Sequence, residues 1–243
     1  MSGTVAILQA RMGSERLPGK ILKDLAGEPM LARVVERARR AKSLDRVVVA
    51  TTTDASDEPV AALCARRGWP VYRGSPGDLL DRYYQAAKLE DATTVARITC
   101  DCPLIDPELI DRVVGLFRQG EPVDYASNTL PPRSFPRGLD LEVFSFAALE
   151  RAWKEDRDPA WREHVTPYLY RHPELFKLKG LVDDQDRSAL RLTVDTPEDF
   201  ELVRRIYESF GHDRFSWREA LSLLDAHPDW LELNRHVGQR EVG

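Results

Sequence analysis

Short runs of β-branched residues alternate with amphipathic helical patterns through the first half of this sequence, and this alternation restricts the fold more than any other feature. Val5–Leu8 and Val47–Ala50 have the composition of buried parallel strands. Between them, apolar residues recur at helical spacing over 30–38, with arginines on the opposite face. Further strands are predicted at 71–72 and 94–98, and further helices over 58–67, 79–89 and 107–117. The alternation predicts an α/β fold, with a mostly parallel sheet and helices on both faces.

The second half of the chain departs from this regular alternation. Residues 122–142 are rich in Pro, Gly, Asn and Arg, and a strand is expected over 139–144. Ala189–Val194 is expected to return to the sheet as a further strand. Thr196, Pro197 and Asp199 then form a helix-start pattern, and Gly211 can end that helix. We therefore expect a single domain over 1–243, with an insertion at about 122–185.

Composition excludes several classes of protein. The chain carries 35 Lys plus Arg against 40 Asp plus Glu, a net charge of −5, which argues against nucleic-acid binding. No apolar run reaches the roughly 18 residues of a membrane span, and the N-terminal residues do not have the layout of a signal peptide. Cys64, Cys100 and Cys102 are an odd set without a nearby histidine, which favours reduced thiols over disulfides or zinc. A cytoplasmic enzyme without a membrane partner is the expectation.

A basic, glycine-containing loop follows the first predicted strand. Ligands bind at the carboxyl ends of strands in open α/β sheets, and glycines let backbone N–H groups approach an anion. The sequence therefore predicts a polyphosphate site here, although a solvated basic loop is the alternative. The loop is not a Walker A motif, because Ile21 follows the lysine where a Ser or Thr is required. Its relevant residues are Arg11, Gly13, Ser14, Arg16, Gly19 and Lys20.

Two aspartates follow predicted strands and are expected at the same edge of the sheet as the basic loop. Asp101 comes after the strand at 94–98, and Asp195 comes after the strand at 189–194. Paired carboxylates from separate strands are a usual way to hold Mg²⁺ against substrate phosphates. The alternatives are a turn residue before Pro103 for Asp101 and a helix-start residue for Asp195. Together with the basic loop, the two aspartates predict a Mg²⁺ site.

At this point the sequence resembles a known family. Gln9–Lys20 is similar to the signature A-R-x-x-S-x-R-L-P-x-K of the cytidylyltransferases that activate acidic sugars, the CMP-Kdo and CMP-sialate synthetases. The resemblance is strongest to their branch like spore coat polysaccharide biosynthesis protein F, and it extends in order over about 4–235. The other stretches that carry it are 72–82, 97–105, 138–142, 163–167 and 191–199.

The resemblance implies a GT-A-type, Rossmann-like nucleotidyltransferase domain that forms a homodimer through the inserted segment. It places Arg11, Ser14, Arg16 and Lys20 on the triphosphate of CTP and Asp101 and Asp195 on Mg²⁺. It also places the nucleoside near the backbone from Leu8 to Ala10 and near Arg73 and Ser75. A sugar hydroxyl or phosphate oxygen would attack the α-phosphorus while pyrophosphate leaves, with Arg11, Lys20 and Asp101 as the catalytic set. Cys100 departs from the small residue usual in this branch, and its bulk is expected to alter nucleotide packing.

The sugar acceptor is expected over the insertion, where polar residues crowd around Gly138. Asp140 and Glu142 have strand spacing and are expected to face the same side, where they could bind sugar hydroxyls. A solvated strand face is the alternative for this pair, and a structural hydrogen bond at a helix end is the alternative for His164. The predicted acceptor residues are Asn128, Arg137, Asp140, Glu142 and His164.

Three functions are therefore weighed from the sequence. The first is a Mg²⁺-dependent transfer of CMP from CTP to a sugar or acidic sugar, for surface polysaccharide or glycan synthesis. The second is a glycosyltransferase on the same fold, but Asp101-Cys102-Pro103 does not provide its D-x-D motif. The third is a non-catalytic nucleotide-binding module, which typically loses a metal ligand or a loop cation, and this chain keeps both.

Overall fold

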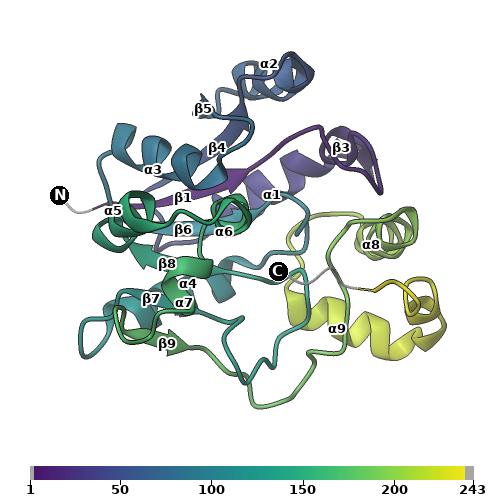
Figure 1. Ribbon diagram of the computed structural model, residues 1–243. Helices are drawn as coiled ribbons and strands as arrows, with labels where there is room; N and C mark the ends of the chain where they lie inside the picture. The colour runs from purple at the N-terminus through teal and green to yellow at the C-terminus, as the bar shows by residue number, and fades with distance from the viewer. Residues whose placement is uncertain (1–2, 239–243) are drawn as a thin grey trace.

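The computed structural model describes residues 3–238, and within that range the main sheet has seven strands in the order β5-β4-β1-β6-β8-β7-β9. Strand β8 runs antiparallel to both of its neighbours, and every other pairing in this sheet is parallel (Figure 1). The expected mostly parallel sheet is therefore confirmed. Its strands are β1 (Gly3–Gln9), β4 (Arg46–Thr52), β5 (Val71–Gly74), β6 (Ala92–Thr99), β7 (Tyr125–Ser127), β8 (Glu142–Ser145) and β9 (Leu178–Gly180). A hairpin of β2 (Asp24–Leu25) and β3 (Glu28–Pro29) is separate from this sheet.

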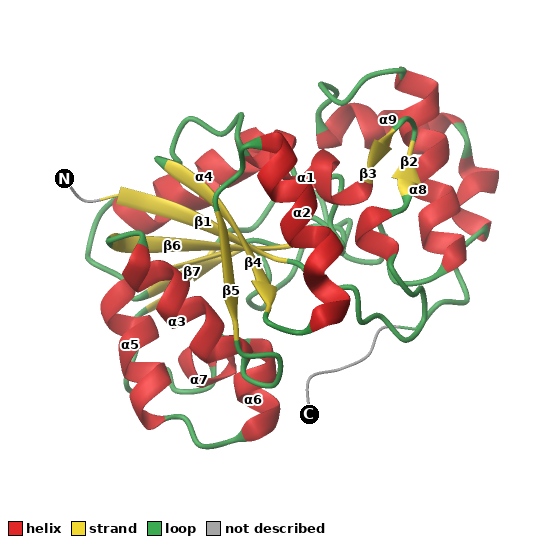
Figure 2. Ribbon diagram, turned by 90° about the horizontal axis from the view of Figure 1, so that it is seen from above, coloured by secondary structure: helices red, strands yellow, loops and turns green. Residues whose placement is uncertain are grey.

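Helices cover both faces of the sheet, as the alternation predicts (Figure 2). Val5 and Ile7 of β1 belong to a cluster with α3 (Leu79–Leu89) and α5 (Phe146–Glu155). Ala6 and Leu8, which point to the opposite face, belong to a cluster with α1 (Met30–Ala38), α2 (Glu58–Arg67) and α4 (Pro107–Arg118). The remaining helices are α6 (Pro159–His164), α7 (Pro167–Tyr170), α8 (Pro197–Phe210) and α9 (Trp217–Ala226).

Local sequence signals agree with the ends of several elements. In α8, the Thr196 side chain accepts a hydrogen bond from the Asp199 backbone N–H at 3.3 Å, and Asp199 accepts one from the Thr196 N–H at 3.1 Å. Gly211 ends this helix in the left-handed conformation at φ +67°. The predicted capping box and helix end are therefore confirmed, which fixes where the chain enters α8.

The segment 122–185 joins the main sheet instead of standing apart from it. It supplies β7, β8 and β9, and α5 packs on the same face as α3. The strand expected over 139–144 begins only at Glu142. These strands extend the sheet beyond β6, so the predicted insertion and the first half of the chain share one core.

The strand predicted over Ala189–Val194 is wrong. Residues 189–195, which we call the return segment, form a single bridge between Arg191 and Arg137. Two backbone hydrogen bonds make this bridge, from Arg137 N–H to Leu190 O at 2.9 Å and from Leu192 N–H to Arg137 O at 2.7 Å. The pairing stops there because Pro136 has no N–H to donate and the chain turns at Gly138, where φ is +100°. The composition of 189–194 was therefore not sufficient to form a strand.

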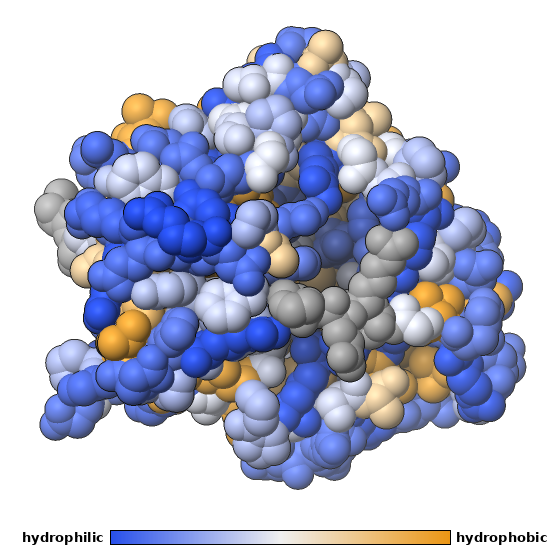
Figure 3. Space-filling model, in the orientation of Figure 1, coloured by the Kyte–Doolittle hydropathy of each residue, from blue (hydrophilic) through white to orange (hydrophobic). Residues whose placement is uncertain are grey.

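The surface is mostly hydrophilic on the face that Figure 3 shows, with apolar residues scattered over it. Within residues 3–238, no helix combines the length and the apolar character needed to cross a membrane. The apolar side chains are concentrated in the two clusters on either side of the sheet.

Candidate active site

A cleft of about 740 Å³ opens at the carboxyl ends of β1, β5 and β6. This is the edge at which ligands bind in open α/β sheets, and the size suits a small-molecule substrate. The loop after β1, the loop after β5, the start of α3, the end of β6, the end of α6 and the return segment all contribute to its walls. The lining residues are Gln9–Arg11, Gly13–Arg16, Lys20, Ile21, Pro76, Gly77, Leu79, Arg82, Thr99–Asp101, Glu163, His164 and Asp195.

Lys20 lies between the two predicted metal aspartates. Its Nζ is 3.3 Å from Asp101 Oδ2 and 2.8 Å from Asp195 Oδ1, and it also donates to the Val194 carbonyl at 2.7 Å. Burial alone would lower the pKa of Lys20, but the two carboxylates outweigh it and raise that pKa above its ordinary value. The structure therefore brings Lys20, Asp101 and Asp195 together as one charged group.

Asp195 reaches this group through the return segment and not through a sheet strand. The Val194 N–H donates to the Asp101 carbonyl at 2.8 Å, which fixes the segment beside the end of β6. The Asp195 carboxylate then pairs with Arg16 at 3.0 Å and with Arg191 at 2.8 Å. Burial would raise the pKa of Asp195, but Lys20, Arg191 and Arg16 together lower it. Asp195 is therefore held as a carboxylate.

The donor set of this group fits a metal ion that shares its coordination with a substrate. Asp101 and Asp195 offer carboxylate oxygens, the ligands that Mg²⁺ prefers, and both carboxylates lie within reach of a single ammonium group. Among the residues that the structure describes, three or more metal-binding side chains do not gather at any point. Substrate phosphates and water would therefore have to complete the coordination, which is the usual arrangement for Mg²⁺ at phosphate-transfer sites.

The basic loop presents further cations and backbone groups to the same cleft. Arg11 is 53% exposed and forms a long ion pair of 3.5 Å with Glu163, which belongs to α6. Ser14 accepts a hydrogen bond from the Leu17 N–H at 3.3 Å, which shapes the loop. Gly19 adopts φ +66° immediately before Lys20, a conformation that favours glycine. The cleft therefore combines Arg11, Arg16 and Lys20 at the end of β1, the arrangement expected for a polyphosphate site.

Three residues predicted near the nucleoside do not have side chains on the cleft. The Leu8 side chain is buried in the core, whereas Ala10 does line the cleft. Arg73 turns to the Thr52 carbonyl at 3.1 Å and to Glu58. Ser75 accepts a hydrogen bond from the Asp78 N–H at 3.1 Å and shapes the turn into α3. The next two residues of that turn, Pro76 and Gly77, are the ones that line the cleft.

Most of the predicted acceptor residues have structural partners. Asn128 is buried, donates to the Leu139 carbonyl at 2.7 Å and accepts from the Leu141 N–H at 2.9 Å. Glu142 is also buried, and it accepts from the Tyr125 and Thr166 hydroxyl groups, each at 2.6 Å. A buried amide or carboxylate needs such partners, which is why these two side chains turn inward.

The other acceptor candidates divide between the cleft and its surroundings. Asp140 precedes β8 instead of sharing its face with Glu142, and it pairs with Arg133. Arg137 forms the bridge to the return segment. His164 lines the cleft, and burial together with the charge of nearby Arg97 lowers its pKa. His164 is therefore the one member of the predicted acceptor set among the cleft-lining residues.

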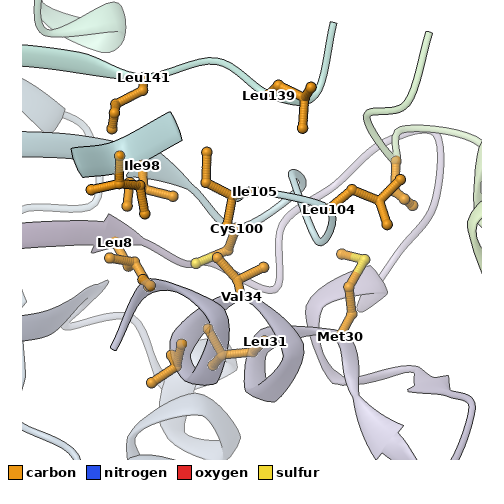
Figure 4. Close-up of a cluster of buried hydrophobic side chains, with 14 of the residues drawn as sticks. Leu8, Met30, Leu31, Val34, Ile98, Cys100, Leu104, Ile105, Leu139 and Leu141 are labelled. Carbon is orange, nitrogen blue, oxygen red and sulfur yellow. The ribbon is translucent and has the colours of Figure 1, made fainter. Parts of the chain in front are cut away.

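The Cys100 side chain packs into the core where the end of β6 borders the cleft. Its side chain is buried, with 2% of the residue exposed, and belongs to the core cluster with Leu8, Val34 and Ile105 (Figure 4). The backbone around Cys100 and Asp101 borders the cleft while the thiol points into the core. The larger side chain therefore fills core space at the border of the cleft, and its effect on nucleotide packing stays a prediction.

Sequence reasoning assigned no role to several lining residues, among them Thr99, Glu163 and Arg82. Arg82 carried a detectable signal, since it lies on the buried face of α3 among Leu79, Tyr83 and Ala86. A charged residue in an apolar helical stripe requires an explanation, because burying it is costly. The others carried no separate signal in the pattern of residues.

The comparisons with known proteins agree with this geometry. A family model for cytidylyltransferases matches residues 5–220. The spore coat polysaccharide biosynthesis protein SpsF of Bacillus subtilis is 34% identical over 238 residues, covering 94% of this chain and 97% of that protein. A 3-deoxy-manno-octulosonate cytidylyltransferase of Anaeromyxobacter dehalogenans is 33% identical over 182 residues, covering 70% of this chain and 74% of that enzyme.

A solved cytidylyltransferase from Leptospira borgpetersenii has the same fold, with a TM-score of 0.90 at 33% identity, covering 99% of this chain and 100% of that one. The α/β nucleotidyltransferase fold expected from the resemblance is therefore confirmed. The family model spans most of the chain and includes the basic loop, Asp101 and Asp195. The protein is a nucleotidyltransferase enzyme and belongs to the cytidylyltransferase family.

Proposed function

We propose that this enzyme transfers CMP from CTP to an acidic sugar, with Mg²⁺ as cofactor and pyrophosphate as the second product. The observation that carries the proposal is Lys20, which lies between Asp101 and Asp195 at the carboxyl edge of the sheet. That group combines cations for a triphosphate with oxygen ligands for a divalent ion. The family and the 3-deoxy-manno-octulosonate relative support CTP and an acidic sugar as the substrates.

The proposed chemistry depends on positioning and charge. Asp101 and Asp195 would hold Mg²⁺, which would neutralise charge on the phosphate oxygens when bound. Lys20, Arg16 and Arg11 would bind the triphosphate and stabilise the charge that develops as pyrophosphate leaves. An oxygen of the sugar forms the new bond to the α-phosphorus as the bond to the leaving pyrophosphate breaks. The catalytic set expected from the sequence, Arg11, Lys20 and Asp101, is retained in this proposal.

The acceptor is proposed to approach from α6, on the side of the cleft formed by Glu163 and His164. Because the pKa of His164 lies below its ordinary value of 6.5, its imidazole is neutral at pH 7 and can accept a hydrogen bond from a sugar hydroxyl. The exposed ion pair between Arg11 and Glu163 lies on the same side. A carboxylate on the sugar could pair with Arg11 in place of Glu163.

Pyrophosphate release from CTP in the presence of candidate sugars tests the proposal. The purified protein is incubated with Mg²⁺, CTP and 3-deoxy-manno-octulosonate or sialate, and pyrophosphate is measured by a coupled assay. Asp101→Asn and Asp195→Asn are expected to lower turnover at least about 100-fold, because each removes a charged ligand of the ion. The exposed Asp184→Asn is the matched control and is expected to retain wild-type turnover.

Three results would contradict the proposal. Full turnover by both site variants would remove these aspartates from the reaction. Consumption of a CMP-sugar without any pyrophosphate would instead favour the glycosyltransferase alternative. Binding of CTP without turnover of any sugar would favour the non-catalytic module. A homodimer formed through 122–185 and a cytoplasmic location are part of the same proposal, and sedimentation velocity checks the dimer.

A further inference from the structure

The Asp195 carboxylate is bound by a buried arginine, Arg191, which lies four residues earlier in the return segment. The Arg191 guanidinium donates to Asp195 Oδ2 at 2.8 Å, while Lys20 contacts the other oxygen, Oδ1, also at 2.8 Å. Arg191 is 8% exposed and is not one of the described residues that line the cleft. Its contact with the charged group is therefore made through Asp195.

Asp199, in the first turn of α8, holds Arg191 in place. Its carboxylate accepts hydrogen bonds from Arg191 Nε and Nη2, each at 2.9 Å, which makes a two-pronged ion pair. Asp199 is fully buried, and its Oδ2 also accepts from the backbone N–H groups of Asp195 at 3.0 Å and Thr196 at 3.1 Å. A buried carboxylate with this many partners keeps one orientation, so the guanidinium that it binds is fixed as well.

A third residue, Asn234, joins the chain after α9 to the same ion pair. Its side-chain amide donates to the Arg191 carbonyl and to Asp199 Oδ1, each at 2.9 Å. Asn234 is 4% exposed and lies 35 residues after Asp199 in the sequence. The capping box of α8 is already complete with Thr196 and Asp199, so the helix start does not require this contact. Three separate parts of the chain therefore fix Arg191 beside Asp195.

The two oxygens of the Asp195 carboxylate have different surroundings as a result. Oδ2 pairs with Arg191 at 2.8 Å and with Arg16 at 3.0 Å. Oδ1 instead contacts Lys20, whose Nζ also lies 3.3 Å from Asp101 Oδ2. Oδ1 is therefore the oxygen turned toward Asp101. The last torsion of an aspartate side chain is broad and roughly two-fold, so a carboxylate without such a partner can exchange its oxygens. A planar arginine fork that is itself fixed prevents this rotation.

We propose that Arg191 is a positioning residue for the Mg²⁺ site, holding Asp195 Oδ2 so that Oδ1 is presented to the ion. This inference rests on the proposed function, in which Asp101 and Asp195 hold Mg²⁺. Arg16 also contacts Oδ2, but it lines the cleft and is proposed to bind the triphosphate. Arg191 is engaged by Asp199 and so stays beside Asp195 when the nucleotide is bound. Residues that orient a metal ligand without touching the metal typically contribute about 10- to 100-fold to metal affinity.

The effect of Mg²⁺ on CTP binding tests this proposal, because it reports on the ion without requiring turnover. CTP is titrated calorimetrically into wild type and Arg191→Lys, each with Mg²⁺ and without a divalent ion. Arg191→Lys keeps the positive charge but loses the planar fork that serves Asp195 and Asp199 together. Its affinity for metal-free CTP is expected to stay within about twofold, whereas the enhancement by Mg²⁺ is expected to fall about tenfold or more. Arg187→Lys is the matched control and is expected to change neither, because Arg187 forms a surface ion pair with Asp225.

Asn234→Ala is a second variant that leaves every charge of this network in place, and it decides the question if Arg191→Lys does not fold. Loss of its two hydrogen bonds loosens Arg191, so the enhancement by Mg²⁺ is expected to fall about two- to fivefold. An unchanged enhancement in the folded variants would overturn the proposal. An equal loss of CTP affinity with and without Mg²⁺ would also overturn it, because Arg191 would then support the fold or the nucleotide and not the ion.

These outcomes are distinguishable from a failure of the proposed function. If wild type binds CTP more tightly with Mg²⁺ and releases pyrophosphate, while Arg191→Lys keeps the full enhancement, only the inference about Arg191 fails. If Mg²⁺ does not strengthen the binding of CTP to wild type, the proposed Mg²⁺ site at Asp101 and Asp195 fails and the role of Arg191 fails with it.

Discussion

A substitution at Gly138 is expected to reduce activity although this residue does not line the cleft. Gly138 adopts φ +100°, and its backbone lies against the return segment that carries Asp195. A Cβ built on Gly138 would lie 2.3 Å from the Thr193 nitrogen and 2.4 Å from the Leu192 carbonyl carbon. Both contacts are with backbone atoms, which cannot rotate away as the end of a side chain can. Gly138→Ala must therefore move the return segment.

The size of this movement follows from the distances. Ordinary van der Waals contact begins at 3.4 Å, so the separation of 2.3 Å must increase by about 1.1 Å. Asp195 lies two residues beyond Thr193, and its carboxylate pairs with Lys20 at 2.8 Å. A misplacement of about 1 Å in a catalytic arrangement can cost about 100-fold in rate, equivalent to ~2.7 kcal/mol of activation free energy. We therefore expect kcat for pyrophosphate release to fall about 100-fold.

Gly27→Ala is the matched control for this experiment. Gly27 is exposed and adopts φ +91°, but a Cβ built on it meets nothing within 4 Å. Both variants share the backbone strain of a non-glycine residue at positive φ, of order 1–3 kcal/mol, whereas only Gly138→Ala displaces the return segment. The assay compares kcat and the free energy of unfolding for the two variants. If Gly138→Ala, correctly folded, turned over as fast as Gly27→Ala, the argument that Gly138 positions Asp195 would be refuted.

Four further predictions concern Lys20, Asp195, the cysteines and the end of β5. The pKa of Lys20 is raised, so its contribution to stability is complete below its ordinary pKa of 10.5 and is lost as the pH rises through the folded-state pKa. In urea unfolding, the difference in free energy of unfolding between wild type and Lys20→Met should therefore shrink above that pH. A constant difference would contradict this. The pKa of Asp195 is lowered, so its contribution to stability is present above its ordinary pKa of 3.8 and is lost as the pH falls through the folded-state pKa. Acid unfolding of Asp195→Asn, compared with wild type, measures this loss. All three cysteines are buried, and burial raises the pKa of each thiol. A thiol reagent should therefore react with none of them in the native protein at mildly alkaline pH, and with all three in guanidinium chloride. Rapid labelling of the native protein would contradict their burial. Gly74→Ala places a Cβ 2.7 Å from the Tyr72 ring and 3.1 Å from Arg82 Cγ, so these side chains must shift and the melting temperature should fall. An unchanged melting temperature would refute the expectation.

Local patterns in the sequence were sufficient for much of the fold. Apolar spacing predicted α1, α2 and α3 with the bounds that the structure has, because a helix is specified by contacts between residues three or four apart. The start of α8 was predicted from Thr196 and Asp199 for the same reason, since a capping box is closed within one turn. The sequence also located the basic loop at the end of β1, because a loop after a buried parallel strand emerges at a known edge of the sheet.

Partnership between distant residues was decided only by the tertiary structure. The apolar run at 189–194 has the composition of a strand, but its neighbour is the turn around Gly138, which leaves room for a single bridge. Asp195 still reaches Asp101 because the Val194 N–H bonds to the Asp101 carbonyl, a contact that no local pattern encodes. The sequence predicted that Asp195 lies near Asp101, and the structure shows this proximity although the strand from which it was predicted is absent.

The tertiary structure also decided the roles of polar residues in the second half of the chain and in α3. Asp140 and Glu142 were equally plausible ligands in the sequence, yet Glu142 is buried against Tyr125 and Thr166. Arg82 attracted no role, yet it lies on the cleft without a partner among the described residues. A buried polar group becomes structural when the folded chain supplies its hydrogen-bond partner and becomes available to a ligand when the chain does not. The sequence determines which polar groups exist and on which elements they lie, and the packing of distant elements decides which of them remain available for binding.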